Sequence, residues 1–226
     1  MIITIDGPTA SGKSTVGRML AHQLGYYYLN SGLLYRAVAY LLMHDERCTH
    51  EQLATVEVAV LTYYTDPSLL IYRYDDGISS VLFNNVDITA QLITEVVGLA
   101  ASTLGTNEYA RQLLTTMQQR MVHDRNSVID GRDAGSVVCK DADYKFFLTS
   151  PVAVRAQRWL SAQRDTSREY STNQVIDRIT QRDRQDTERR CAPLHIAKDV
   201  IVIDSEAMTA QETVDYILRT MHGVHD

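Results

Sequence analysis

One segment near the start of the chain has the residue types of a phosphate-binding loop. It reads Gly7-Pro8-Thr9-Ala10-Ser11-Gly12-Lys13-Ser14 and fits the pattern GxxxxGK[ST] throughout. Glycines let the backbone turn tightly with its N–H groups toward the phosphates, and a helix starting at Lys13 adds its positive end. We expect Lys13 to reach the β- and γ-phosphates of ATP and Ser14 to bind Mg²⁺, with Thr15 as the alternative metal ligand. The residues predicted to bind ATP are Gly7, Pro8, Thr9, Ala10, Ser11, Gly12, Lys13, Ser14 and Thr15.

Charged residues in the second half of the chain could complete such a site. Asp130 follows the apolar pair Val128-Ile129, so we expect it to hold Mg²⁺ through water; the alternative is a helix cap or a turn residue at a strand end. Arg182, Asp186 and Arg189 are spaced by four and then three positions, which places them on one face of a helix. By itself, that spacing is also typical of a solvated charged face.

The surrounding sequence predicts an α/β fold. A β-branched strand, the glycine loop and an amphipathic helix over Lys13–Leu24 form the opening of a βαβ unit. Strands are predicted at roughly 2–5, 27–29, 127–130, 144–148 and 200–203, and further helices at Ser31–Arg47, Glu51–Tyr63, Glu95–Leu104, Glu108–Val122 and Thr209–Met221. This pattern indicates a parallel sheet of about five strands with helices on both faces.

Two segments depart from the regular alternation. Ser68–Tyr74 and Ser79–Phe83 flank the turn signal Asp75-Asp76-Gly77, which predicts a small hairpin. About 50 arginine-rich residues of helical character lie between the last two core strands. We predict one domain with a core at about 1–63, 123–153 and 191–226, an insert at about 64–122 and a lid region at about 154–190.

Composition narrows the classes of function. The 226 residues are 45% hydrophobic and 22% charged, which is typical of a chain that buries a core. A net charge of −6 disfavours wholesale nucleic-acid binding, and no apolar run is long enough to span a membrane. No signal segment precedes the first strand, so we expect the fold to begin with the chain. The three scattered cysteines are interpreted as reduced thiols of a cytoplasmic protein.

Several separated motifs together resemble the bacterial cytidylate kinase family. They are the phosphate loop, Asn30-Ser31-Gly32-Leu33-Leu34-Tyr35-Arg36, and Asp130-Gly131-Arg132-Asp133-Ala134-Gly135-Ser136-Val137-Val138. Further matches are Glu95-Val96, Ala100-Ala101-Ser102, Arg182 through Arg189, Ala192-Pro193-Leu194 and Val202-Ile203-Asp204-Ser205, in the family's order. The resemblance covers nearly the whole chain. It implies a P-loop nucleoside monophosphate kinase fold with a small β-containing acceptor-binding insert and a helical lid.

The resemblance also implies roles for individual residues. Arg36, Arg132 and Arg189 would bind the acceptor phosphate, and Ser31 would line the same site. Ser102 and Arg111 would read cytosine, and Asp133 would contact cytosine or its surroundings. Arg182 and Asp186 would bind the ribose. Arg155 and Arg158 would be lid arginines that act in catalysis with Lys13, Arg132 and Arg189, whereas Arg164, Arg168 and Arg178 are expected to be solvated. The chain departs from the family at Asn30, usually Asp, at Ser14-Thr15, often Gly-Thr, at Cys139-Lys140, and at Asn107–Ala110 before Arg111.

The implied reaction is ATP + CMP (or dCMP) ⇌ ADP + CDP (or dCDP), with Mg²⁺ accompanying ATP and the protein acting as a monomer. A GTPase would carry an NKxD-type motif, which the sequence lacks. A P-loop kinase for UMP, shikimate or dephospho-CoA remains an alternative, as does a non-catalytic nucleotide-binding regulator. The sequence leaves open the preference between CMP and dCMP and the activity on UMP.

Overall fold

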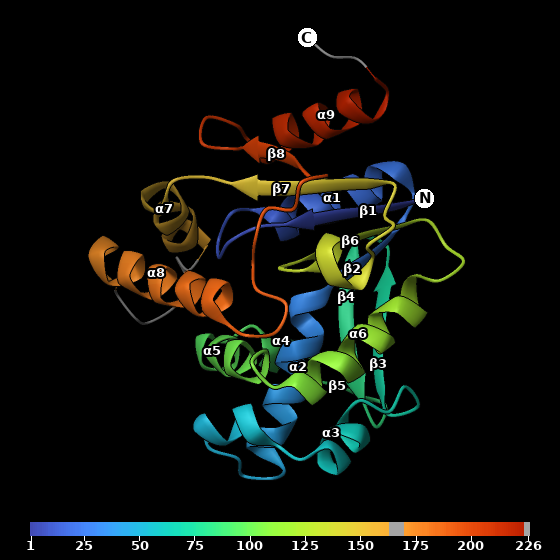
Figure 1. Cartoon of the computed structure of the whole chain (residues 1–226), viewed down its shortest axis with the longest axis vertical. Helices are drawn as coiled ribbons and strands as arrows, with labels where there is room; N and C mark the ends of the chain where they lie inside the picture. Colours follow the sequence, from blue (N-terminus) through green and yellow to red (C-terminus); the bar gives the residue numbers. More distant parts are fainter. Residues whose placement is uncertain (163–169, 224–226) are drawn as a thin grey trace.

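The runs predicted as strands pair into one parallel sheet. The structure is a computed structural model that describes residues 1–162 and 170–223. Within those residues the sheet has five strands in the order β2-β6-β1-β7-β8, which confirms the predicted fold class. Their bounds are β1 (Ile2–Asp6), β2 (Tyr27–Asn30), β6 (Ser127–Gly131), β7 (Tyr144–Thr149) and β8 (Ile201–Asp204). All pairs are parallel, so the carboxyl ends of the strands share one edge (Figure 1).

One face of the sheet packs against the helices that follow the first and last strands. Ile3 and Ile5 of β1 are fully buried against α1 (Lys13–Leu24) and α9 (Ala210–Met221). Gly25 ends α1 in the left-handed conformation (φ 68°), as its position after the last periodic residue predicts. This face anchors the phosphate loop, because α1 begins at Lys13.

The other face is covered by α2 (Ser31–His44), α6 (Glu108–Val122) and a short π-helix, η2 (Ala134–Val138). Because side chains alternate along a strand, Thr4 and Asp6 of β1 point to this face and meet η2. α2 ends at His44, three residues before the predicted end.

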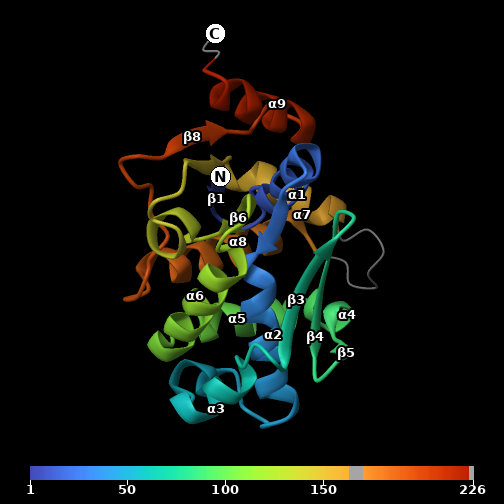
Figure 2. The same cartoon turned by 90° about the vertical axis from the view of Figure 1, so that its right-hand side faces the viewer.

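The predicted hairpin is the core of the insert. β3 (Leu70–Asp75) and β4 (Ile78–Phe83) pair through Asp76 and Gly77, both with positive φ. A third strand, β5 (Val86–Asp87), which the sequence reading missed, follows Asn84 and Asn85, again both with positive φ. Figure 2 shows this ribbon standing beside α2.

The prediction of one helix over Glu51–Tyr63 was wrong. A short 3₁₀ helix, η1 (Glu51–Thr55), is separated from α3 (Val58–Tyr64) by Val56 and Glu57, whose ψ angles of 134° and 146° are extended. The Val56 carbonyl instead accepts a hydrogen bond from Asn107 Nδ2 at 3.1 Å. A contact 51 positions away in sequence therefore breaks the helix.

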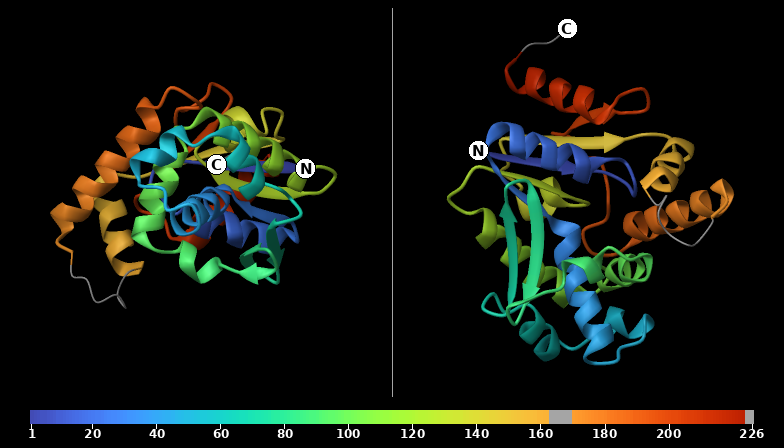
Figure 3. Two further views of the ribbon diagram at one scale, coloured as in Figure 1. Left: turned by 90° about the horizontal axis from the view of Figure 1, so that it is seen from below. Right: turned by 180° about the vertical axis from the view of Figure 1, so that it is seen from behind.

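The remaining helices of the insert follow the prediction. α5 (Glu95–Leu104) and α6 have the predicted bounds, with Thr94 and Asn107 capping their first amides. Only the four-residue α4 (Thr89–Leu92) was missed. Figure 3 shows that these elements lie on the opposite side of the sheet from α9.

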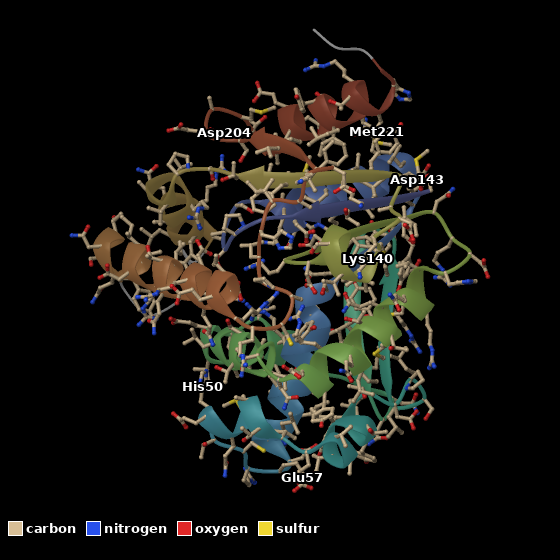
Figure 4. The ribbon with its side chains drawn as sticks, viewed as in Figure 1. His50, Glu57, Lys140, Asp143, Asp204 and Met221 are labelled. Carbon is tan, nitrogen blue, oxygen red and sulfur yellow. The ribbon has the colours of Figure 1, made fainter. Side chains whose placement is uncertain are left out.

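Two helices from the lid region lie beside the carboxyl edge of the sheet. They are α7 (Val152–Ala162) and α8 (Thr172–Glu188), which begins at a capping box of Ser171 and Gln174. In Figure 4 Asp204, at the end of β8, lies on the side of these helices, while Asp143, before β7, lies at the opposite edge. Arg164 and Arg168 lie outside the described residues.

Candidate active site

A polar cavity of about 330 Å³ opens between the strand ends, α2, α5 and α8. It brings together residues from almost the whole length of the chain, including every residue predicted to bind the acceptor. The predicted site residues that line it are Thr9, Ala10, Lys13, Ser14, Ser31, Arg36, Ser102, Arg111, Asp130, Arg132, Asp133, Arg182, Asp186 and Arg189. The convergence of the arginines on Lys13 agrees with their predicted placement, while their individual roles stay predictions.

The phosphate loop wraps closely around the end of β1. A Cβ at Gly7 would lie 2.2 Å from the Leu148 carbonyl oxygen, so a side chain there is excluded. Gly12 precedes α1 with φ of 92°. Lys13 Nζ donates to the Pro8 carbonyl at 2.8 Å. Burial, followed by the charge of Arg132, lowers the pKa of Lys13 well below its ordinary value, so this ammonium favours a nearby anion.

Two oxygen ligands suited to Mg²⁺ lie where the loop meets β6. Ser14 Oγ donates to Asp130 Oδ2 at 2.5 Å, and Tyr28 Oη donates to Asp130 Oδ1 at 2.9 Å. A hydroxyl and a carboxylate are the hard donors that Mg²⁺ prefers. The described residues contain no cluster of three acidic, histidine or cysteine side chains placed for a metal. Thr15 lines the neighbouring cavity instead.

A buried carboxylate organises three of the arginines. Asp186 accepts from Arg132 Nε at 2.7 Å, and its other oxygen lies 3.6 Å from Arg189 Nη1. Burial alone would raise the pKa of Asp186, but Arg132, Arg182 and Arg189 outweigh it and lower that pKa. Arg182 Nε has no hydrogen-bond partner among the described residues. Burial and then Arg132 lower the pKa of Arg182 to about 10.

A second buried ion pair lies at the far end of the cavity. Arg111 pairs with Asp133, donates to the Gly105 carbonyl at 3.2 Å and lies 5.6 Å from the centre of the Tyr35 ring. Ser102 Oγ, which lines the same cavity, donates to Asp186 Oδ1 at 3.4 Å. Arg111 thus reaches the cavity although the sequence before it departs from the family.

Arg36 and Ser31 project from α2. Arg36 Nη1 donates to the carbonyls of Leu92 and Thr94 at 2.7 and 3.0 Å, and a Cβ at Gly98 would clash with the guanidinium.

Asn30 caps α2 by accepting from Leu33 N at 3.1 Å. An Asp at position 30 could do the same, so the substitution preserves the cap.

A second cavity, of about 470 Å³, adjoins the first along the phosphate loop. Arg158 and Trp159 of α7 line it, together with Ser205, Met208 and Thr209 after β8. Arg158 Nη2 donates to the Ser205 carbonyl at 2.5 Å. Four residues, Ala10, Lys13, Ser14 and Trp159, line both cavities.

Arg155 lies behind the loop and lines neither cavity. Its Nη1 donates to the Thr9 carbonyl at 2.8 Å and to Asp183 Oδ2 at 2.5 Å, while Asp183 Oδ1 accepts from Thr9 N at 2.8 Å. The phosphate loop and α8 are thereby joined through one arginine and one carboxylate. The family motifs gave no signal for Asp183.

Arg178 is exposed, as expected, but its side chain also makes contacts that the sequence did not indicate. Arg178 pairs with Glu95 of α5 and stacks 4.5 Å from the centre of the Tyr170 ring, and Tyr170 Oη donates to Glu95 at 2.7 Å. These contacts join the lid region to the insert. Sequence reasoning also missed Trp159, although it is the single tryptophan of the chain and adjoins Arg158.

Comparisons with known proteins agree with these features. A family profile described as cytidylate kinase matches residues 3–223. The chain is 36% identical over 217 residues to a cytidylate kinase of Thermotoga sp. (strain RQ2), covering 96% of this chain and 94% of the relative. It is 35% identical over 222 residues to a cytidylate kinase of Methylococcus capsulatus, covering 98% and 97%. An uncharacterized protein from Eubacterium ventriosum shares the fold, with a TM-score of 0.53 and 11% identity over 98% of both chains.

Proposed function

We propose, on the premise that this chain belongs to the cytidylate kinase family, that it transfers the terminal phosphate of ATP to CMP and dCMP. The family makes it an enzyme, a nucleoside monophosphate kinase. The observation that carries the finer proposal is the meeting of two cavities at the phosphate loop. One is lined by arginines, and the two share Lys13 and Ser14.

The two cavities suit two nucleotides whose phosphates meet. The larger one runs from the phosphate loop toward Arg158 and Thr209, where the base and ribose of ATP would lie. The arginine-lined cavity would hold the acceptor. Because Lys13 and Ser14 line both, the terminal phosphate of ATP and the acceptor phosphate would lie on either side of these two residues, as in-line transfer requires.

The far end of the acceptor cavity offers the groups that cytosine needs. Cytosine presents O2 and N3 as acceptors and N4 as a donor. Arg111 supplies donors, the Asp133 carboxylate accepts from N4, and the Ser102 hydroxyl can do either. The buried Arg111–Asp133 pair is held before binding, so little side-chain ordering remains to be done. Arg182 and Asp186 would bind the ribose in the same cavity.

The chemistry is mainly electrostatic. The acceptor phosphate is already ionised, so no general base has to create a nucleophile. Arg36, Arg132 and Arg189 would neutralise that phosphate, and Lys13 would follow the charge of the migrating group. Burial of Lys13 in a cationic environment makes its ammonium a strong partner for that charge. When bound, Mg²⁺ would neutralise the ATP phosphates, with Ser14 as a ligand and Asp130 acting through water.

Helices α7 and α8 would exclude water from the transfer. Arg158 lines the ATP cavity, and Arg155 fixes the loop to α8 through Thr9 and Asp183. We propose that these two arginines act with the lid region when both nucleotides are bound. We also propose a cytoplasmic monomer; the structure has no helix in its described residues that is long and apolar enough to cross a bilayer.

The test is ADP release, coupled to an indicator enzyme, with a panel of acceptors. CMP and dCMP should give the highest kcat/KM, with UMP, AMP, shikimate and dephospho-CoA well below. Multiple turnovers exclude a nucleotide-binding regulator. Faster turnover of any other acceptor would refute the substrate assignment while leaving the family intact.

A further inference from the structure

Asp6 is a buried carboxylate that the proposed reaction does not use. It is the last residue of β1 and directly precedes the phosphate loop at Gly7. Its side chain points away from α1, toward η2, and the residue is 7% exposed. Oδ1 accepts from Ala134 N and Oδ2 accepts from Gly135 N, both at 2.8 Å. Each carboxylate oxygen thus binds one of two consecutive backbone amides.

Burying the Asp6 carboxylate costs free energy, because a charged group loses its hydration. Burial raises the pKa of Asp6 to about 6, although the two backbone hydrogen bonds oppose that rise. The charged or titratable groups that face it are Asp133, Lys13 and Cys139. Asp133 adds repulsion, and Lys13 is engaged with Pro8. The carboxylate is therefore held mainly by the first amides of η2, which have no partner within that helix.

The two amides belong to a segment that also carries acceptor residues. Arg132 and Asp133 immediately precede Ala134, and they reach in different directions, to Asp186 and to Arg111. The positions of both side chains therefore depend on where the backbone enters η2.

Close packing limits that turn further. A Cβ at Gly135 would lie 2.7 Å from Thr4 Oγ1, on the same face of β1 as Asp6. The start of η2 is thus held against β1 by the hydrogen bonds to Asp6 and by close packing that only a glycine at position 135 allows.

We propose that Asp6 is a positioning residue, which holds the segment 132–135 in register with the phosphate loop so that acceptor and donor phosphates are aligned. The inference rests on the proposed function for the identity of the acceptor. The hydrogen bonds of Asp6 do not depend on which acceptor is bound. Asp6 touches neither nucleotide in this proposal. It acts through the backbone of Ala134 and Gly135.

The informative substitution is Asp6→Asn. One amide oxygen can still accept a hydrogen bond, but the NH₂ group faces the second backbone N–H and leaves it unpaired. The matched control is Thr4→Val, two positions earlier on the same face and nearly the same size. Thr4 Oγ1 has no hydrogen-bond partner among the described residues, so its loss should leave the segment in place.

Kinetics with both substrates test the proposal, using whichever acceptor the wild-type protein turns over. In D6N, the KM for the acceptor should rise about tenfold and kcat should fall, while the KM for ATP stays within about twofold. This corresponds to one backbone hydrogen bond to a charged group. T4V should match the wild type. Equal increases in both KM values, or none, would overturn the proposal.

The pH dependence provides a signature that a merely structural role would not give. A protonated Asp6 resembles Asn, because it has lost its negative charge and one of its two polar ends has become a donor group. The gap in kcat/KM between T4V and D6N, which is more than tenfold because KM rises and kcat falls, should therefore close as the pH falls below about 6. Comparing the two variants cancels titration of the acceptor phosphate. A gap that stays constant to pH 5 would contradict the assignment.

Amide hydrogen exchange gives a readout independent of activity. The Ala134 and Gly135 amides should exchange faster in D6N than in T4V, while amides within β1 stay protected. If D6N fails to fold, Gly135→Ala provides a second route, because its Cβ must displace the same segment. G135A should show the same selective rise in acceptor KM, and unchanged acceptor kinetics would refute the proposal. A wild type inactive toward CMP but active toward another acceptor would refute the proposed function alone.

Discussion

Replacing Arg182 with Met should make the protein more stable and a much weaker binder of the acceptor. Arg182 is partly buried in α8 beside Val175 and Ile179, and its Nε lacks a hydrogen-bond partner among the described residues. Burial and the neighbouring Arg132 disfavour its charge, while Asp186 only partly compensates. Met has a similar length and no charge, so it can fill the same space.

The magnitude follows from the pKa of the guanidinium. Folding lowers the pKa of Arg182 from 12.5 to about 10. A cation with a lowered pKa destabilises the folded state at every pH below the folded value, so the penalty is fully present at neutral pH. At about 1.4 kcal/mol for each unit of pKa, the penalty is roughly 3 kcal/mol. After relaxation we expect R182M to gain at least about 1 kcal/mol, which raises Tm by about 2–4 °C.

Thermal unfolding with and without the acceptor checks both halves of the prediction. Arg184→Met is the control, because Arg184 is exposed and pairs with Glu188 one turn away. The Tm of this variant should hardly change. Saturating CMP should raise the Tm of the wild type and R184M but hardly that of R182M, whereas ATP should stabilise all three. A lower Tm for R182M than for R184M in the absence of nucleotide would refute the reasoning.

Four further substitutions test other parts of the site and its surroundings. Lys13→Ala should lower kcat at least about a hundredfold. The circular dichroism spectrum of the variant should be unchanged, because a buried cation with a lowered pKa does not stabilise the fold. Near-normal turnover would show that Lys13 is not a catalytic residue. Tyr28→Phe removes a hydrogen-bond donor from Asp130, so the Mg²⁺ concentration for half-maximal rate should rise about tenfold, and an unchanged Mg²⁺ titration would contradict that role. Glu95→Gln and Arg178→Gln each break the same partly exposed ion pair, so each should raise the acceptor KM about two- to fivefold. If the two effects on the acceptor KM are fully additive in the double variant, the two side chains do not act together.

The sequence was sufficient for the features that depend on local pattern. The glycine loop, its preceding strand and its following helix are contiguous, so their chemistry and geometry could be read together. The one-face spacing of Arg182, Asp186 and Arg189 also predicted their convergence, because a helix fixes which side chains are neighbours. The family motifs then predicted that this helix lies near Arg36 and Arg132, which the spacing of residues within one helix could not predict.

What could not be predicted depends on contacts between distant segments. Helical periodicity continues through Val56, and only its hydrogen bond from Asn107 explains the break. The ion pair of the exposed Arg178 could not be predicted, because its partner, Glu95, belongs to the insert. The role of Asp6 was equally hidden, since the amides that it binds lie 128 and 129 positions further along the chain.

The balance of charges in the acceptor cavity explains why carboxylates are placed among arginines. The charged groups that line the cavity are six cations, which are Lys13 and the guanidinium groups of Arg36, Arg111, Arg132, Arg182 and Arg189, and the three carboxylates of Asp130, Asp133 and Asp186. Without the carboxylates, mutual repulsion would drive the guanidinium groups apart. With them, three positive charges remain in excess, and a phosphate monoester dianion neutralises up to two. We therefore expect the filled cavity to retain a positive charge toward Lys13, where a migrating phosphoryl group needs it.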